Sequence, residues 1–151
     1  MPKKIFSVLF MFVFIFTLTI PAKASSFNVE HLSNGDYIVS EISPINSEIS
    51  LFTSTVTKTK TSTYYTGNNV KCWSVSVTGT FTYGNGSASC KSASCSTSVY
   101  NSSWSTGSRK SSKNGNKATA SAIGERYNNG QVIQTVSRSV TLTCSSTGQF
   151  S

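Results

Sequence analysis

The chain of 151 residues has few groups that can transfer protons, since it contains five acidic residues and one histidine. From residue 53 to the end it has a single carboxylate, Glu125, and no histidine. Nucleophilic hydrolysis needs a base beside the nucleophile, and glycoside hydrolysis needs a pair of carboxylates. The serines of this stretch lack such a base, and Glu125 beside Arg126 is more typical of a surface ion pair than of an acid catalyst. The sequence therefore predicts a protein that is not an enzyme.

Long apolar runs are absent except near the N-terminus. Residues 5–20 are nearly all Phe, Val, Ile and Leu, and two lysines precede them. Pro21 ends the run, and Ala22-Lys23-Ala24 matches the A-x-A cleavage pattern of a secretory signal. A retained membrane anchor, the alternative, needs about 20 apolar residues. The pattern predicts a signal peptide over residues 1–24 and a secreted, extracellular protein.

Charge is divided unequally between the two segments that follow. Residues 25–52 hold four carboxylates and no Lys or Arg, whereas residues 53–151 hold seven Lys, three Arg and one Glu. This split predicts an acidic leader or linker over 25–52 and a basic domain over 53–151. We interpret the leader as a spacer or an edge strand, and a propeptide that masks the basic domain is the alternative.

The basic segment has the alternation of β-strands. Between Val70 and Tyr83, large apolar residues occupy one face and Cys72 with several Ser and Thr occupies the other. Turns rich in Gly and Asn recur about every 10–15 residues. The pattern predicts an all-β protein, an antiparallel and immunoglobulin-like β-sandwich of about six to seven strands. Trp73 is assigned to its core, and Trp104 and Tyr100 are more typical of a core than of an exposed stacking surface.

Four cysteines in an exported chain predict two disulfides. If successive strands alternate in direction, the favoured pairs are Cys90–Cys144 at one end and Cys72–Cys95 lower down. The rival pairing, Cys72–Cys144 with Cys90–Cys95, requires the first segment to be a loop. The spacing of Cys90 and Cys95 does not match a zinc site, and no phosphate-binding loop is present, so we expect no metal and no cofactor.

The remaining functional signal is positive charge. Four basic residues cluster around one predicted turn and two lie on the next hairpin: Arg109, Lys110, Lys113, Lys117, Arg126 and Arg138. Such a patch attracts polyanions, although a solvated basic loop that only aids solubility is the alternative. We expect a secreted binding protein for an anionic cell-envelope or matrix component, either a polymer or a membrane surface, without specific recognition of nucleic acid. The alternative is an antimicrobial or toxin-like protein that acts on target membranes.

Two stretches of the basic segment resemble a group of known proteins. These are WSVSVTGTFTYGNGSASC, from Trp73 to Cys90, and VTLTCSSTGQFS, from Val140 to Ser151. They are similar to uncharacterised small secreted proteins of Gram-positive bacteria, over about residues 53–151. The resemblance implies an exported β domain and identifies no catalytic residue.

Overall fold

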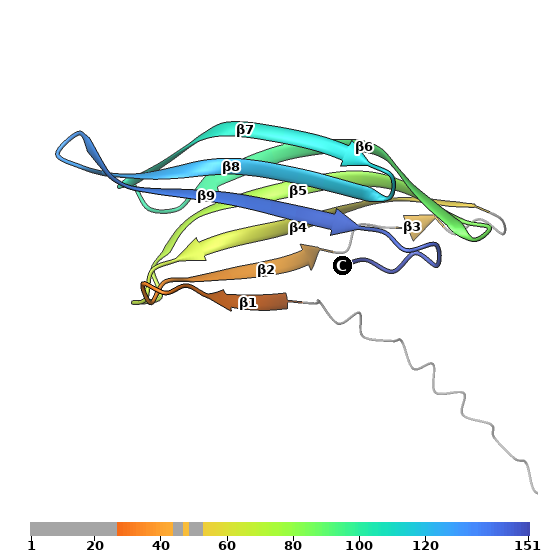
Figure 1. Cartoon of the computed structure of the whole chain (residues 1–151), viewed down its shortest axis with the longest axis horizontal. Coiled ribbons are helices and arrows are strands. Elements are labelled where there is room, and N and C mark those ends of the chain that lie inside the picture. Colours follow the sequence, from red (N-terminus) through yellow and green to blue (C-terminus); the bar gives the residue numbers. More distant parts are fainter. Residues whose placement is uncertain (1–26, 44–46, 49–52) are drawn as a thin grey trace, which may run out of the picture.

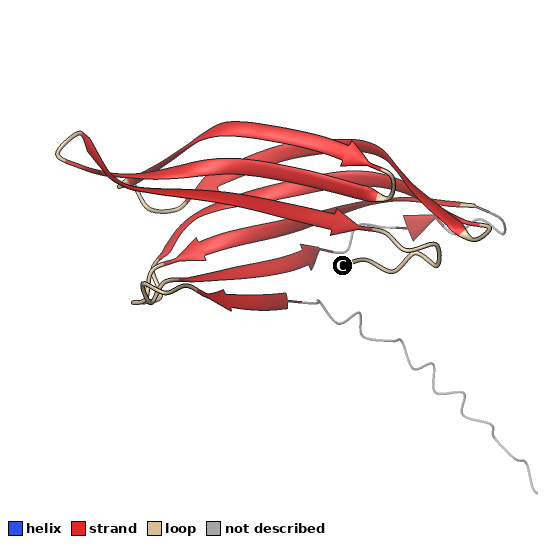
Figure 2. Ribbon diagram, viewed as in Figure 1, coloured by secondary structure: helices blue, strands red, loops and turns tan. Residues whose placement is uncertain are grey.

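The computed structural model describes residues 27–43, 47–48 and 53–151. All regular secondary structure within these residues is β-strand. The predicted signal peptide lies outside these residues. The described part contains nine strands: β1 (Phe27–His31), β2 (Tyr37–Ser43), β3 (Ser47–Glu48), β4 (Ser54–Tyr65), β5 (Lys71–Gly84), β6 (Ser87–Val99), β7 (Trp104–Asn114), β8 (Lys117–Asn128) and β9 (Gln131–Thr143). The predicted all-β class is confirmed (Figure 2).

The strands form two antiparallel sheets that pack face to face (Figure 1). The larger sheet has the order β1-β2-β4-β5-β6, with the short β3 paired to β4, and the smaller has the order β7-β8-β9. Each long strand thus pairs with the next long strand along the chain, except where β6 passes to β7. Immunoglobulin domains instead use Greek-key connections. The immunoglobulin-like topology and the count of six to seven strands are therefore corrected to two packed meanders with nine described strands.

Part of the acidic segment forms the outer strands of the larger sheet. β1 pairs with β2, and β2 pairs with β4 from Tyr37 opposite Tyr65 to Ser43 opposite Thr59. Ile38 on β2 is 1% exposed and belongs to the hydrophobic core. The described residues of this segment are thus integrated into the sheet, with β1 as its edge strand.

The core lies between the sheets and contains the apolar face predicted for residues 70–83, whereas Cys72, predicted on the polar face, is also buried. The large side chains of β5 pack in one buried cluster with small residues of β8 and apolar residues of β9: Trp73, Val75, Val77, Phe81, Ala118, Ala120, Ala122, Val140 and Leu142. A Cβ atom on Gly124 of β8 would lie 2.2 Å from Cε2 of Trp73, so the indole ring fills the space that this glycine leaves. Trp73 and Trp104 are buried as predicted, whereas Tyr100 is 50% exposed.

The outer face of β4 and β5 carries a row of paired hydroxyl groups. Three hydrogen bonds of 2.8–2.9 Å join residues that lie directly opposite each other: Thr57–Thr80, Thr59–Thr78 and Thr61–Ser76. Cross-strand pairs of this kind stabilise a sheet, and a slip of one residue would bring the polar face into the core. The hydroxyl row therefore supports the same register as the buried face of β5.

Candidate functional site

Four of the six predicted binding residues lie along β7 and its turn into β8. Arg109, Lys110 and Lys113 belong to β7, and Lys117 is the first residue of β8, opposite Asn114. All four are exposed, and none forms an ion pair with a described residue. The structure therefore places three of these cations on the edge strand β7 and the fourth beside the turn where β8 begins.

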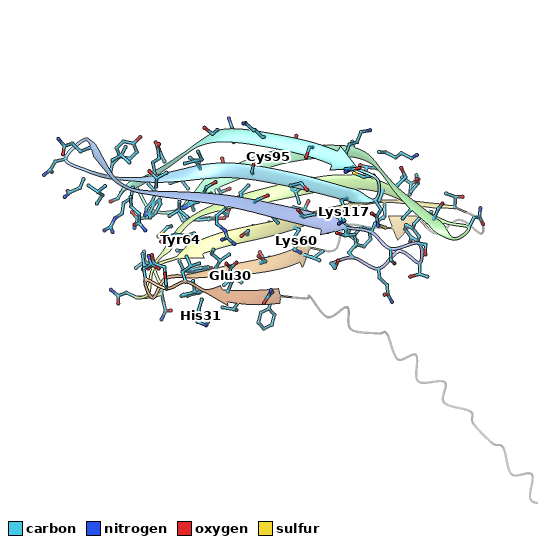
Figure 3. The ribbon with its side chains drawn as sticks, in the orientation of Figure 1. Glu30, His31, Lys60, Tyr64, Cys95 and Lys117 are labelled. Atoms are coloured by element: carbon cyan, nitrogen blue, oxygen red, sulfur yellow. The ribbon has the colours of Figure 1, made fainter. Side chains whose placement is uncertain are left out.

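A fifth cation, which the sequence analysis did not include, joins them from β6. The ammonium group of Lys113 donates a hydrogen bond of 2.7 Å to the backbone oxygen of Lys91. Lys91 lies at a register shift of β6, because Ser92 pairs with Thr80 and Cys90 pairs with Phe81. We call Lys91, Arg109, Lys110, Lys113 and Lys117 the basic strip; Figure 3 shows where Lys117 lies.

The other two predicted residues lie apart from the basic strip. Arg138 on β9 donates a hydrogen bond of 2.8 Å to Glu30 on β1, so this ion pair joins the smaller sheet to the edge of the larger one. Arg126 lies toward the opposite end of β8, next to Trp104 on β7 and Gln134 on β9. The expected ion pair with Glu125 does not form, and Glu125 accepts a hydrogen bond of 2.8 Å from Tyr127.

Arg126 lines a cleft at the end of the sandwich where several turns meet. The cleft has a volume of about 440 Å³, and its walls come from the β1–β2, β4–β5 and β6–β7 turns with residues of β7, β8 and β9. Most of the wall is amide, hydroxyl and backbone. Its side chains include Asp36, Asn68, Asn101, Trp104, Arg126 and Gln134.

Asp36 organises the hydrogen bonds of this cleft. Its carboxylate accepts from the Gly67 amide at 2.9 Å, from Nδ2 of Asn34 at 2.7 Å and from the hydroxyl of Tyr64. Burial opposes ionisation, but these hydrogen bonds outweigh it and lower the pKa of Asp36 below 3.8. Burial, together with the hydrogen bond and charge of Asp36, raises the pKa of Tyr64 to about 12. At neutral pH the cleft therefore holds a carboxylate fixed by a neutral phenol.

Replacing Asp36 by Asn is expected to lower the free energy of unfolding at pH 7 by about 1–2 kcal/mol, because three donors lose a charged acceptor that is only partly buried. The folded pKa lies below the ordinary 3.8, so this stabilisation is complete above pH 3.8 and is lost as pH falls through the folded pKa. Urea unfolding between pH 7 and pH 2 measures it. The difference in the free energy of unfolding between wild type and D36N should shrink in acid. A difference that is constant with pH would contradict the role assigned to the ionised Asp36 carboxylate.

All four cysteines are free thiols in the structure, so the two predicted disulfides are not formed. Cys90 and Cys144 lie on either side of the β7–β8 turn: the Cys90 amide donates to Gly115 at 2.8 Å and the Cys144 amide donates to Asn116 at 3.0 Å. Burial raises the pKa of the Cys144 thiol, and the nearby Cys90 raises it further. This pair of the favoured connectivity is thus close in space.

The second favoured pair, Cys72–Cys95, is wrong for this fold. Cys95 lies opposite Val77, five residues along β5 from Cys72. At the rise of an extended strand this separation is about 17 Å, whereas bridged Cα atoms lie within about 7 Å. The rival Cys90–Cys95 bridge fails for the same reason, since both residues lie on β6 with the same spacing.

Several observations on the described residues concern metal ligands, membrane spans and reactive side chains. They contain no group of three or more His, Cys, Asp and Glu placed to hold a metal ion, and no helix long and apolar enough to cross a membrane. Burial raises the pKa of Cys72, Cys90 and Cys144, which keeps these thiols protonated and weakly nucleophilic at neutral pH. His31 lies on the outer strand β1, where its ring centroid is 6.0 Å from that of Tyr37 (Figure 3).

Comparisons with known proteins were made for the whole chain. No family model and no curated protein matches it. Among solved structures, the crystal structure of the hypothetical protein lmo2686 from Listeria monocytogenes EGD-e is similar, with 18% sequence identity and a TM-score of 0.42. The match covers 84% of this chain and 95% of the Listeria chain.

Proposed function

We propose that this protein is a secreted, non-enzymatic binding protein whose basic strip holds an anionic component of a cell envelope or matrix. The observation that supports this proposal is the set of cations on β6, β7 and the start of β8, which have no carboxylate partner among the described residues. Arg138, by contrast, is neutralised by Glu30. Unpaired cations on neighbouring strands produce a positive field that concentrates polyanions.

The spacing of the basic strip suits a polymer with repeated negative charges. Lys110 and Lys113 are about 10 Å apart along an extended strand, which is close to the Debye length at 0.1 M salt. Their side chains leave opposite faces of the edge strand β7, but their fields overlap along this edge, where a chain of phosphates or carboxylates can contact both. Binding that depends on such contacts is expected to weaken as salt concentration rises.

The test is titration of the protein with purified teichoic acid, with neutral dextran as the reference polymer. The double variant Lys110→Ser/Lys113→Ser is expected to raise the dissociation constant for teichoic acid about tenfold at low salt, because it removes two cations from the centre of the strip. Lys71→Ser is the control, since it removes a cation that lies instead over the ring of Tyr100 at 3.8 Å.

Two outcomes would contradict the charge mechanism. The first is an equal loss of teichoic acid binding in the Lys71→Ser control. The second is binding that stays unchanged between low and physiological salt, since surface electrostatics are screened over that range.

One observation favours a second function, action on target membranes. The β8–β9 hairpin projects beyond the other turns of its end of the sandwich (Figure 1), and it exposes Tyr127, Val132 and Ile133. Exposed apolar side chains that gather in one place mark contact surfaces. Dye leakage from anionic vesicles distinguishes the two functions. A protein that only binds causes no leakage, whereas a membrane-active protein causes leakage that the double variant Val132→Ser/Ile133→Ser abolishes.

We also propose that export allows Cys90 and Cys144 to form a single disulfide. Both residues are buried on either side of the same turn, and oxidising compartments favour the bond. This bridge would tie β6 of the larger sheet to the end of β9 in the smaller one.

A further inference from the structure

The cleft around Asp36 has the dimensions and rigidity of a small-molecule site. Its volume of about 440 Å³ falls within the range of ligand pockets in proteins. Backbone hydrogen bonds hold its walls: the amides of Tyr100 and Asn101 donate to Cys72 at 2.8 and 3.2 Å, and the Tyr127 amide donates to Ser103 at 2.7 Å. A site held in this way loses little conformational freedom when a ligand binds.

Several polar groups of the wall keep hydrogen-bonding capacity that no described residue uses. The side chain of Arg126 lines the cleft and forms no ion pair and no hydrogen bond with a described residue. The oxygen of Asn101 accepts from the Ser103 amide at 2.9 Å, which leaves its NH₂ group as a donor. The NH₂ group of Gln134 donates to Tyr64 at 3.0 Å, which leaves its oxygen as an acceptor. Asp36 Oδ1 accepts one bond, from Gly67, and can accept another.

These free groups of the cleft favour a particular class of ligand. A guanidinium group binds a carboxylate through two parallel hydrogen bonds. Free amide donors beside free oxygen acceptors suit hydroxyl groups, since a hydroxyl both donates and accepts. The negative charge of Asp36 disfavours a second anionic group on the unit that occupies the cleft. We propose that the cleft binds an acidic saccharide through one hexuronic acid unit, with its carboxylate on Arg126 and its hydroxyls on Asn101, Gln134 and Asp36.

The rim of the cleft adds apolar surface for the C–H face of a sugar ring. Val70 lines the cleft and is 43% exposed, and Trp104 contributes part of the wall. The cleft lies at the opposite end of β8 from Lys117, so this site and the basic strip are separate. It therefore goes beyond the proposed function and stands without it, because it recognises one sugar unit rather than the charge density of a polymer.

The experiment is a titration of the full protein with trigalacturonate and with neutral galactotriose. Calorimetry measures the affinities, and NMR of the backbone amides locates the binding site. Wild type is expected to prefer trigalacturonate at least tenfold, with shifts at Gly67, Asn101 and Gln134. The Arg126→Gln variant should bind trigalacturonate no more tightly than it binds galactotriose. Lys110→Ser/Lys113→Ser, which alters the basic strip, should leave trigalacturonate binding unchanged. Urea unfolding confirms that each variant is folded.

Each contrary result overturns the proposal. Wild type that shows no preference for trigalacturonate, or that binds inorganic phosphate more tightly, excludes a uronate site. Unchanged trigalacturonate binding in folded Arg126→Gln excludes the assigned carboxylate contact. If Arg126→Gln does not fold, the wild-type protein decides the question: amide signals of Gly67 and Asn101 that do not shift when trigalacturonate is added exclude the site. Loss of binding in the Lys110→Ser/Lys113→Ser variant alone would move uronate recognition to the basic strip, and the proposed function would remain intact.

Discussion

A Gly124→Ala variant is expected to lose about 3 kcal/mol or more of its free energy of unfolding, at the upper end of the range for overpacked cores. The new Cβ atom would lie 2.2 Å from Cε2, 2.4 Å from Nε1 and 2.6 Å from Cζ2 of Trp73. Trp73 is 0% exposed and sits between the two sheets, so its ring has no free space into which to move. The strand or the indole must shift, and either movement disrupts close packing.

Gly107→Ala is the matched control for this variant. Gly107 lies on β7 of the same sheet, and a Cβ atom placed there meets nothing within 4 Å. Urea unfolding of both variants should show a small change for Gly107→Ala, of a few tenths of a kcal/mol, and a large one for Gly124→Ala. Adding Trp73→Phe to Gly124→Ala should recover part of the loss, because the smaller ring makes room. Equal effects of the two glycine substitutions would contradict this packing.

Oxidation of the wild-type protein is expected to raise the free energy of unfolding by about 4 kcal/mol through a Cys90–Cys144 disulfide. The bond would close a loop that includes β7, β8 and β9, and cross-links that close long loops remove the most freedom from the unfolded chain. The two residues are already buried on either side of one turn, so little native structure has to move. Denaturant unfolding with and without dithiothreitol measures the effect.

Two double variants serve as controls for the disulfide. Cys72→Ala/Cys95→Ala should retain the dependence on dithiothreitol, since those residues lie too far apart to bridge. Cys90→Ala/Cys144→Ala should abolish it. Identical unfolding curves for oxidised and reduced wild type, or a Cys90–Cys95 link in non-reducing peptide mapping, would refute the bridge.

The buried face of β5 could be predicted from the sequence because it depends on strand period alone. Trp73, Val75, Val77 and Phe81 alternate with polar residues, and the structure buries all four. The order of the strands could not be predicted in this way, since it depends on which sheet each strand joins. The Cys72–Cys95 pairing failed on register instead. β5 and β6 are neighbours in one sheet, but Cys95 lies opposite Val77, and the end of β5 that holds Cys72 meets Tyr100 and Asn101 in the turn after β6.

The candidate sites also divide into a part that the sequence could predict and a part that depends on tertiary structure. The basic strip could be predicted in large part because four of its cations are near one another in the chain. Arg138 looked equivalent to them, but its partner Glu30 lies 108 residues away. The cleft draws its residues from three turns and three strands, and only Arg126 among them was predicted to bind a ligand. No local pattern connects Asp36 with Gln134, so their proximity is a product of tertiary structure.

The position of the lysines on β7 has a consequence for how copies of this protein meet. β7 ends the smaller sheet, and its register shifts between Gly107 and Lys110, where Ser108 adopts a φ of 51°. Unpaired strands recruit strands from other molecules, and charge together with a bulge opposes such recruitment. Two copies that approached each other along β7 would bring like charges together on an irregular backbone. The strand proposed to bind a polyanion is thus also expected to resist self-association into extended β-aggregates.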